Sequence, residues 1–149
     1  MFLLLLSHGG YIRAIMIAEE VVFDKFFLTV AYDPETRLLR LKWKGYASAI
    51  EFREGLGFLL SYVRQNDVAY CVSDLKLMST ILPNDEEWAT RFWYPRLAGT
   101  SLKKHAIISS LDFLNNAAIR RIVGAPSAPN GFVTRFFVDP NEAMRWLEE

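Results

Sequence analysis

The chain has 149 residues, and its 17 lysines and arginines balance its 17 aspartates and glutamates. This neutral balance lacks the basic excess of nucleic-acid-binding proteins, so no nucleic acid is expected as a partner. One cysteine and two histidines exclude a disulfide framework and favour neither a metal site nor any other cofactor. A hydrophobic share of 52% indicates a folded domain, and the length fits a single one.

The first fifteen residues begin with the apolar run 1–6, which raises the mean hydropathy of the whole chain. A secretory signal needs a cationic start and roughly 7–15 apolar residues, and a membrane span needs about 20, so neither pattern is met. We expect residues 1–15 to be a disordered or wrongly included extension and residues 16–149 to form the domain. A weak signal, a lipid-contacting arm or an added edge strand remain alternatives. A lone cysteine fits a cytoplasmic protein.

The pattern after residue 16 predicts a β-hairpin. The β-branched and aromatic run 27–32 is typical of a strand, and 33–36 has the composition of a turn. Residues 37–44 alternate apolar and cationic side chains, which predicts a strand with one buried face.

A helix and a buried strand follow. Helical spacing over 47–65 predicts a helix, in which Gly55 and Gly57 allow a close approach to the sheet. The continuous apolar run 68–72 is typical of a central strand that is covered on both faces.

The second half alternates helices and strands. Residues 84–87, Asn-Asp-Glu-Glu, predict a capping box at the start of a helix that Pro95 kinks or ends. Further expected elements are a strand over 103–109, a helix capped by Asp112 and ended by Gly124, a loop over 125–131, a strand over 132–138 and a helix opened by Asp139. The order β-β-α-β-α-β-α-β-α predicts a single α/β domain with a mixed sheet packed by helices.

Five segments carry a resemblance to a known family: Trp43-Lys-Gly45, Val72-Ser-Asp74, Pro83-Asn-Asp-Glu-Glu-Trp88, Lys103-Lys-His-Ala106, and Phe137 with Ala143-Met-Arg-Trp-Leu147. From about Ala18 to the end, the chain resembles the small uncharacterised STAS-like (SpoIIAA-like) bacterial proteins of the Bacteroidetes type. The resemblance implies the STAS fold and a function as an antagonist, transporter tail or sensor module.

Antagonists of this family carry a phosphorylated serine after the third strand, in a segment that reads Asp-Ser-Ser-Gly. The corresponding region here is 74–82, where Ser79 and Thr80 are the nearest hydroxyls. No acid directly precedes these residues and no glycine follows them, so the chain departs from the phosphorylation motif.

Two groups of residues are candidates for chemistry. Asp74 ends the predicted central strand, where it either anchors a ligand or partner or simply caps loop amides. Cys71 and His105 lie in neighbouring predicted strands, but no third group orients such a pair, and a buried structural cysteine is the commoner arrangement. No nucleotide-binding or hydrolase motif occurs, so we expect a non-enzymatic protein.

Trp88, Phe92, Trp93 and Tyr94 place four aromatics within seven residues of one predicted helix. They cannot all face inward, so we expect at least one of them, with Trp93 or Tyr94 as the first choice, to be exposed or to line a groove. The alternative is that they belong to the core, with one residue folded over the kink at Pro95. The first functional hypothesis is regulatory protein–protein contact through the loop-helix surface 75–98, with a protein partner or a second copy. The second is a small apolar or amphipathic ligand bound near Trp88 and Trp93, and an enzyme using Asp74 comes third.

Overall fold

The computed structural model describes residues 2–8, 11–17, 19–124 and 131–149. Its centre is a six-stranded sheet in the order β3-β4-β5-β6-β7-β8. The strands are β3 (Glu20–Lys25), β4 (Leu28–Asp33), β5 (Leu38–Gly45), β6 (Tyr70–Met78), β7 (Lys104–Ile108) and β8 (Val133–Phe137). The first three pair antiparallel, and β5 to β8 pair parallel, so the sheet is mixed as predicted.

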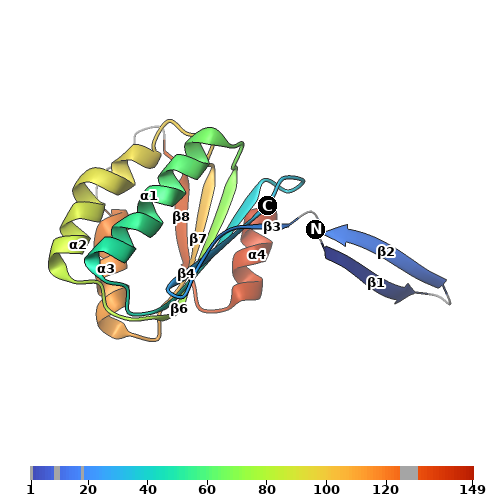
Figure 1. The fold of residues 1–149 in the computed structure, drawn as a ribbon, viewed down its shortest axis with the longest axis horizontal. Helices are drawn as coiled ribbons and strands as arrows, with labels where there is room; N and C mark the ends of the chain where they lie inside the picture. Colours follow the sequence, from blue (N-terminus) through green and yellow to red (C-terminus); the bar gives the residue numbers. More distant parts are fainter. Residues whose placement is uncertain (1, 9–10, 18, 125–130) are drawn as a thin grey trace.

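Helices cover both faces of this sheet. They are α1 (Ala49–Gln65), α2 (Pro83–Trp88) with a π segment (Ala89–Trp93) and a 3₁₀ turn (Tyr94–Leu97), α3 (Phe113–Gly124) and α4 (Pro140–Glu148). Figure 1 shows α1, α2 and α3 on one face and α4 on the other. The larger apolar cluster lies under the first three helices, and a smaller one lies under α4. Both faces of the central strands are therefore covered. Val72 on β6 and Ala106 on β7 are buried under α4. Leu75 and Ile107, from the same two strands, are buried on the opposite face.

Two further strands precede the six-stranded sheet. β1 (Phe2–His8) and β2 (Tyr11–Ile17) pair antiparallel with each other and form a separate two-stranded sheet (Figure 1). The division of the chain into an extension, 1–15, and a domain, 16–149, stays a prediction.

The sequence pattern missed β3 at the edge of the main sheet. Its three consecutive apolar residues do not alternate, and the register with β4 shifts between Val21 and Phe23. A bulge of this kind breaks the period of two on which strand prediction depends. The predicted hairpin of β4 and β5 is confirmed as the inner part of a three-stranded antiparallel unit.

The two glycines of α1 differ in environment. A Cβ on Gly55 would lie 2.7 Å from Cη2 of Trp43 and 2.9 Å from Cδ2 of Leu28, so this glycine permits close packing on the sheet. Gly57 has open space around it and does not face the sheet, so the prediction was right for Gly55 and wrong for Gly57.

Capping differs from the prediction at two helices and agrees at two. The capping box predicted at Asn84 is wrong, because Pro83 begins α2 and Asn84 is already helical. A capping box was missed at α1, where Ser48 Oγ accepts from the Glu51 N–H at 3.2 Å and Glu51 Oε1 accepts from the Ser48 N–H at 2.9 Å. Asp112 and Asp139 cap α3 and α4 through their carboxylates, as expected. Most of the loop predicted over 125–131 lies outside the described residues.

Candidate functional site

Asp74 lies on the face of the sheet that carries α4. Its side chain is half-buried, and its Oδ1 accepts from the backbone N–H of Lys76 at 3.0 Å. This is the structural alternative considered from the sequence, a carboxylate that caps a nearby amide. Ser79 is half-buried just after β6, and its backbone N–H donates to Gly45 O at 2.9 Å. Asp74 and Ser79 are not part of one cluster, because no hydrogen bond connects their side chains among the described residues.

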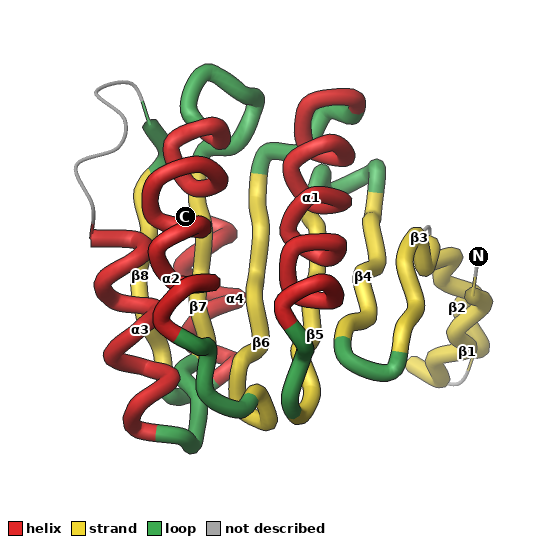
Figure 2. Tube along the Cα trace, turned by 60° about the vertical axis from the view of Figure 1, so that its left-hand side comes forward, coloured by secondary structure: helices red, strands yellow, loops and turns green. Residues whose placement is uncertain are grey.

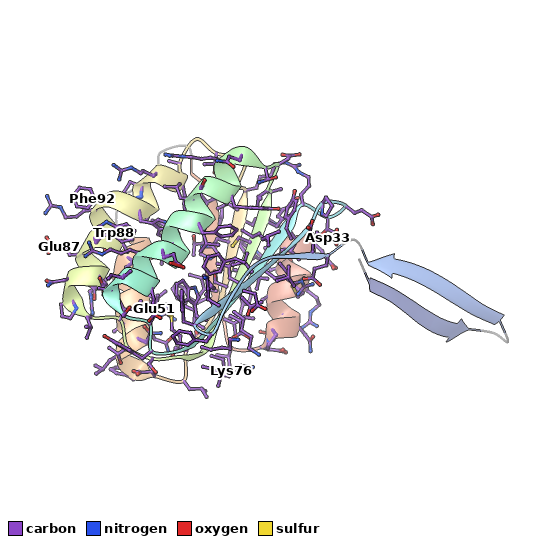
Figure 3. All side chains as sticks on the ribbon, in the orientation of Figure 1. Asp33, Glu51, Lys76, Glu87, Trp88 and Phe92 are labelled. Carbon is purple, nitrogen blue, oxygen red and sulfur yellow. The ribbon has the colours of Figure 1, made fainter. Side chains whose placement is uncertain are left out.

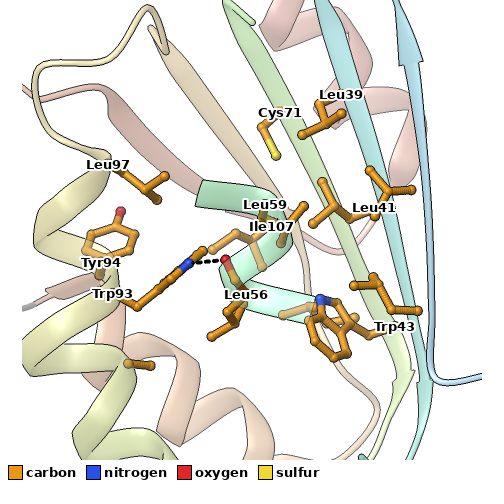
Figure 4. Packing of buried hydrophobic residues seen from close by; sticks show 14 of the residues in the cluster. Leu39, Leu41, Trp43, Leu56, Leu59, Cys71, Trp93, Tyr94, Leu97 and Ile107 are labelled. Carbon is orange, nitrogen blue, oxygen red and sulfur yellow. Dashed lines mark hydrogen bonds between the residues drawn. The ribbon is translucent and has the colours of Figure 1, made fainter. Parts of the chain in front are cut away.

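One member of the aromatic set is exposed, as predicted, but it is not the expected one. Trp93 and Tyr94 are buried, so the choice of these two residues as the exposed ones was wrong. Phe92 is the exposed member, at 47%, and Trp88 is half-buried (Figure 3). Trp93 Nε1 donates to Leu56 O at 2.6 Å and thereby fastens this segment to α1 (Figure 4).

A small apolar cavity lies between the sheet and the helices beside Trp93. Its volume is about 50 Å³, and Ala89, Trp93, Ser73 and His105 are among its lining residues. A second space of about 20 Å³ shares Trp93, Ser73 and His105 and adds Cys71. Trp88 lines neither space, so the structure places Trp93 beside a cavity but does not bring Trp88 to it.

A row of polar side chains crosses this interior. Cys71 on β6, His105 on β7 and Thr134 on β8 are register neighbours on three adjacent strands. Ser73 Oγ and His105 Nε2 share a hydrogen bond of 2.8 Å, and the Tyr94 hydroxyl is 2.7 Å from Thr134 Oγ1. These five residues form what we call the interior polar row, and Figure 4 shows Cys71 and Tyr94 among the surrounding apolar side chains.

The protonation states of the interior polar row oppose nucleophilic chemistry. Burial raises the pKa of Cys71 to about 12, against a smaller opposite effect of its hydrogen bond with Ser73. Burial lowers the pKa of His105 to about 4, so the imidazole is neutral at pH 7. His105 Nδ1 has no hydrogen-bond partner in the described part of the chain, so no carboxylate orients the ring as a catalytic base requires. The thiol is therefore protonated, and the imidazole is held by Ser73 alone among the described residues, which differs from an activated Cys–His pair.

Several exposed apolar side chains lie at the carboxyl ends of the parallel strands. Five of them form the carboxyl-edge patch, namely Leu77, Leu82, Leu111, Phe113 and Leu114. Phe113 is 82% exposed and Leu111 is 79% exposed. The patch lies where the chain passes from β6 into α2 and from β7 into α3. Figure 2 shows these connections at the bottom of the tube.

Hydrogen bonds hold the loops of the carboxyl-edge patch together. The Leu111 N–H donates to Lys76 O at 3.1 Å, which places Leu111 beside Leu77. The Thr80 hydroxyl donates to Asp112 Oδ2 at 2.7 Å, and together with the N–H groups of the first turn of α3 it lowers the pKa of Asp112. Asp112 lies between Leu111 and Phe113 in the chain, so its hydrogen bonds fix the backbone that carries the two most exposed side chains of the patch.

Only Leu77 and Leu82 of this patch fall within the surface 75–98 that the sequence favoured. Leu111, Phe113 and Leu114 were missed, although a signal was present. Their helix buries residues 115, 118 and 122 at helical spacing, so the three large apolar residues around the cap lie off the buried stripe.

Neither a membrane-spanning helix nor a cluster of metal ligands occurs among the described residues. In that part of the chain, no helix is both long and apolar enough to cross a membrane. Within the same residues, no group of three or more histidine, cysteine, aspartate or glutamate side chains is arranged to hold a metal ion.

Comparison with known proteins gives the fold. The structure resembles the crystal structure of an uncharacterised DUF3478-family protein with a SpoIIAA-like fold from Shewanella loihica PV-4, with a TM-score of 0.51 and 16% sequence identity. The match covers 86% of this chain and 99% of the other. The chain is therefore an α/β protein of SpoIIAA-like fold, as the resemblance in its sequence implied. No protein-family model and no curated protein matches the chain.

Proposed function

We propose that this protein is a non-enzymatic, STAS-like module that regulates a partner protein by binding it through the carboxyl-edge patch. The single observation that carries the proposal is the exposed set of large apolar side chains at the end of β6, in the loops after β6 and β7, and at the start of α3. Monomeric proteins rarely expose a contiguous apolar patch without an interaction to use it.

The position of the patch supports the same function. In open α/β sheets, binding takes place outside the carboxyl ends of the strands, where the loops are free to vary over a rigid scaffold. The patch shares Leu77 and Leu82 with the surface 75–98 and continues from there onto the start of α3. Hydrogen bonds through Asp112 hold its loops in place, so partner binding loses little loop entropy.

A bound lipophilic ligand fits the geometry less well. The cavity beside Trp93 measures about 50 Å³, whereas a benzene-binding cavity in a protein core measures roughly 150 Å³. An amphipathic chain would thus require α1 to separate from the π segment. The Trp93–Leu56 hydrogen bond opposes that movement.

The cell compartment follows from the same proposal. A buried free thiol at Cys71 suits a reducing compartment, and we place the protein in the bacterial cytoplasm. Its partner would then be another cytoplasmic protein.

Affinity isolation with matched baits tests the proposed function. The full chain is compared with Phe113→Glu, which places a charge in the patch, and with Val133→Glu, which places one at the opposite edge of the sheet on β8. Val133 is 57% exposed and pairs with Lys104 at the amino end of β7. Proteins enriched by the full chain are identified, purified and titrated.

The expected result is a partner whose affinity falls at least about a hundredfold with Phe113→Glu, because a charge would be buried in an apolar contact. Val133→Glu should bind as the full chain does. A partner that Phe113→Glu binds with unchanged affinity would contradict the proposal.

A further inference from the structure

We infer that the carboxyl-edge patch receives an acidic segment, in which carboxylates flank apolar side chains. The inference rests on the proposed function and adds the chemistry of the partner. It comes from the hydrogen-bonding state of the charged side chains around Leu77 and Leu111.

Two lysines beside the patch have unused donors. Lys44 on β5 is the register neighbour of Leu77 on β6, and Lys76 precedes Leu77 in the chain. Among the described residues, neither ammonium group has a carboxylate within 4.0 Å, and Lys44 Nζ reaches only the Thr29 hydroxyl at 3.5 Å. Lys76 lies at the lower rim of the molecule in Figure 3.

Several carboxylates of the same edge already accept hydrogen bonds. Asp112 accepts from the Thr80 hydroxyl and from two N–H groups of α3, and Asp74 accepts from the Lys76 N–H. Asp85 is buried, with its Oδ1 3.3 Å from Nε of Arg53. Asp112 thus stabilises a helix N-terminus, and Asp85 pairs internally.

Lys44 and Lys76 are therefore cations beside the patch that have no carboxylate within 4.0 Å among the described residues. A suitable partner brings apolar side chains to Leu77, Leu111 and Phe113. It also brings carboxylates to Lys44 and Lys76, so the apolar contacts and the ion pairs form together. Such rim charges fix orientation and accelerate association, while the apolar centre supplies affinity.

Two other occupants fit less well. Binding to an anionic membrane uses clusters of 4–8 basic residues, and here two lysines stand among several carboxylates. A second copy docked through the same patch would bring lysines of like sign together across a two-fold axis.

Three labelled peptides of about 18 residues test the inference, since that length spans several helical turns. They share one stripe of leucines, and their remaining positions are all Glu, all Gln or all Lys. Each is titrated by fluorescence anisotropy against the full chain, Lys44→Glu/Lys76→Glu, Phe113→Glu and a control, Lys103→Glu. Lys103 is exposed and directly precedes β7 at the opposite edge.

We expect the Glu peptide to bind about tenfold tighter than the Gln peptide at about 50 mM salt, with the advantage falling to about threefold at about 500 mM. Lys44→Glu/Lys76→Glu should remove that advantage and leave the Gln peptide unaffected, and Lys103→Glu should change neither. Phe113→Glu should weaken all three peptides.

Other results separate the two proposals. Equal affinities for the Glu and Gln peptides, both lost with Phe113→Glu, would overturn the acidic partner and leave the proposed function standing. Binding of no peptide below about 1 mM, or binding that Phe113→Glu leaves intact, would overturn both. Co-sedimentation with vesicles of phosphatidylcholine and phosphatidylserine, or a dimer that Phe113→Glu dissociates, would also overturn the acidic partner.

Discussion

The interior polar row and the carboxyl-edge patch reverse the usual distribution of side chains. Cys71, Ser73 and His105, which have the chemistry of a nucleophilic site, are buried in the core. Leu111 and Phe113, which have the chemistry of a core, are exposed at the end of the sheet. Residue type alone would favour a site in the interior, whereas burial and protonation oppose nucleophilic chemistry there.

The difference lies in what surrounds each group. In the interior, burial keeps the thiol protonated and the imidazole neutral, so their reactivity is suppressed. At the edge, the apolar side chains lack a covering element among the described residues, while their backbone is fixed by Asp112. Substitutions should therefore affect stability in the interior and binding at the edge.

The largest effect is expected within the aromatic segment. Trp93→Ala should lower the free energy of unfolding by about 3–5 kcal/mol, because it opens a cavity and leaves the Leu56 carbonyl without its donor. Phe92→Ala is the control one residue away, and it should cost less than about 1 kcal/mol, since Phe92 is half-exposed. Urea unfolding at pH 7.5 measures both. Equal losses for the two variants would contradict the assigned orientation.

The next effect concerns the pH dependence of stability. The pKa of His105 is about 4 in the folded chain and about 6.5 when unfolded, so the unfolded state binds more protons between these values. Stability should therefore fall as the pH drops through this window, by about 2 kcal/mol from pH 7.5 to pH 5 through this residue alone. His105→Gln should remove that part of the slope in urea titrations. An unchanged slope would show that the imidazole is not held neutral.

Alkylation measures the reactivity of Cys71 directly. Because burial raises the pKa of its thiol to about 12, iodoacetamide at pH 8 should modify the folded chain at least about a hundredfold more slowly than the urea-unfolded chain. Intact-mass spectrometry follows the reaction. Rapid labelling of the folded chain would reopen a nucleophilic role for the interior polar row.

The smallest effect on stability is expected at the edge. Leu111→Asp should change the free energy of unfolding by less than about 0.5 kcal/mol, because the side chain is already in water. Urea unfolding again measures the change, and a loss above about 2 kcal/mol would show that this side chain supports the fold.

The central helices and strands could be predicted from the sequence because the apolar pattern of each segment fits one type of secondary structure. The alternation in β5 and the cap at Asp112 depend on local contacts, and both are confirmed. The resemblance to SpoIIAA-like proteins then indicated the fold that these elements form, and this fold is confirmed. The edge strand β3 was missed because its register with β4 shifts between Val21 and Phe23, a tertiary feature.

The orientation of the aromatic segment could not be predicted for a different reason. Most of its buried positions follow a spacing of four through Asp85, Ala89, Trp93 and Leu97, and Tyr94 is buried as well. Two of the four are an acid and an alanine, so the buried stripe has little hydrophobic signal beside the apolar pair Trp88 and Phe92. The carboxyl-edge patch was only partly found because exposure depends on which face the neighbouring elements leave open.

Site-specific photocrosslinking in the protein's own cells tests the central claim most directly. p-Benzoylphenylalanine is placed at Leu111 in the carboxyl-edge patch or at Val133 at the opposite edge, both of which are exposed. The account predicts one partner protein crosslinked from position 111, absent from position 133, and lost when Phe113→Glu is added. Crosslinks to the same proteins from both positions, or a partner captured from position 133 alone, would contradict it.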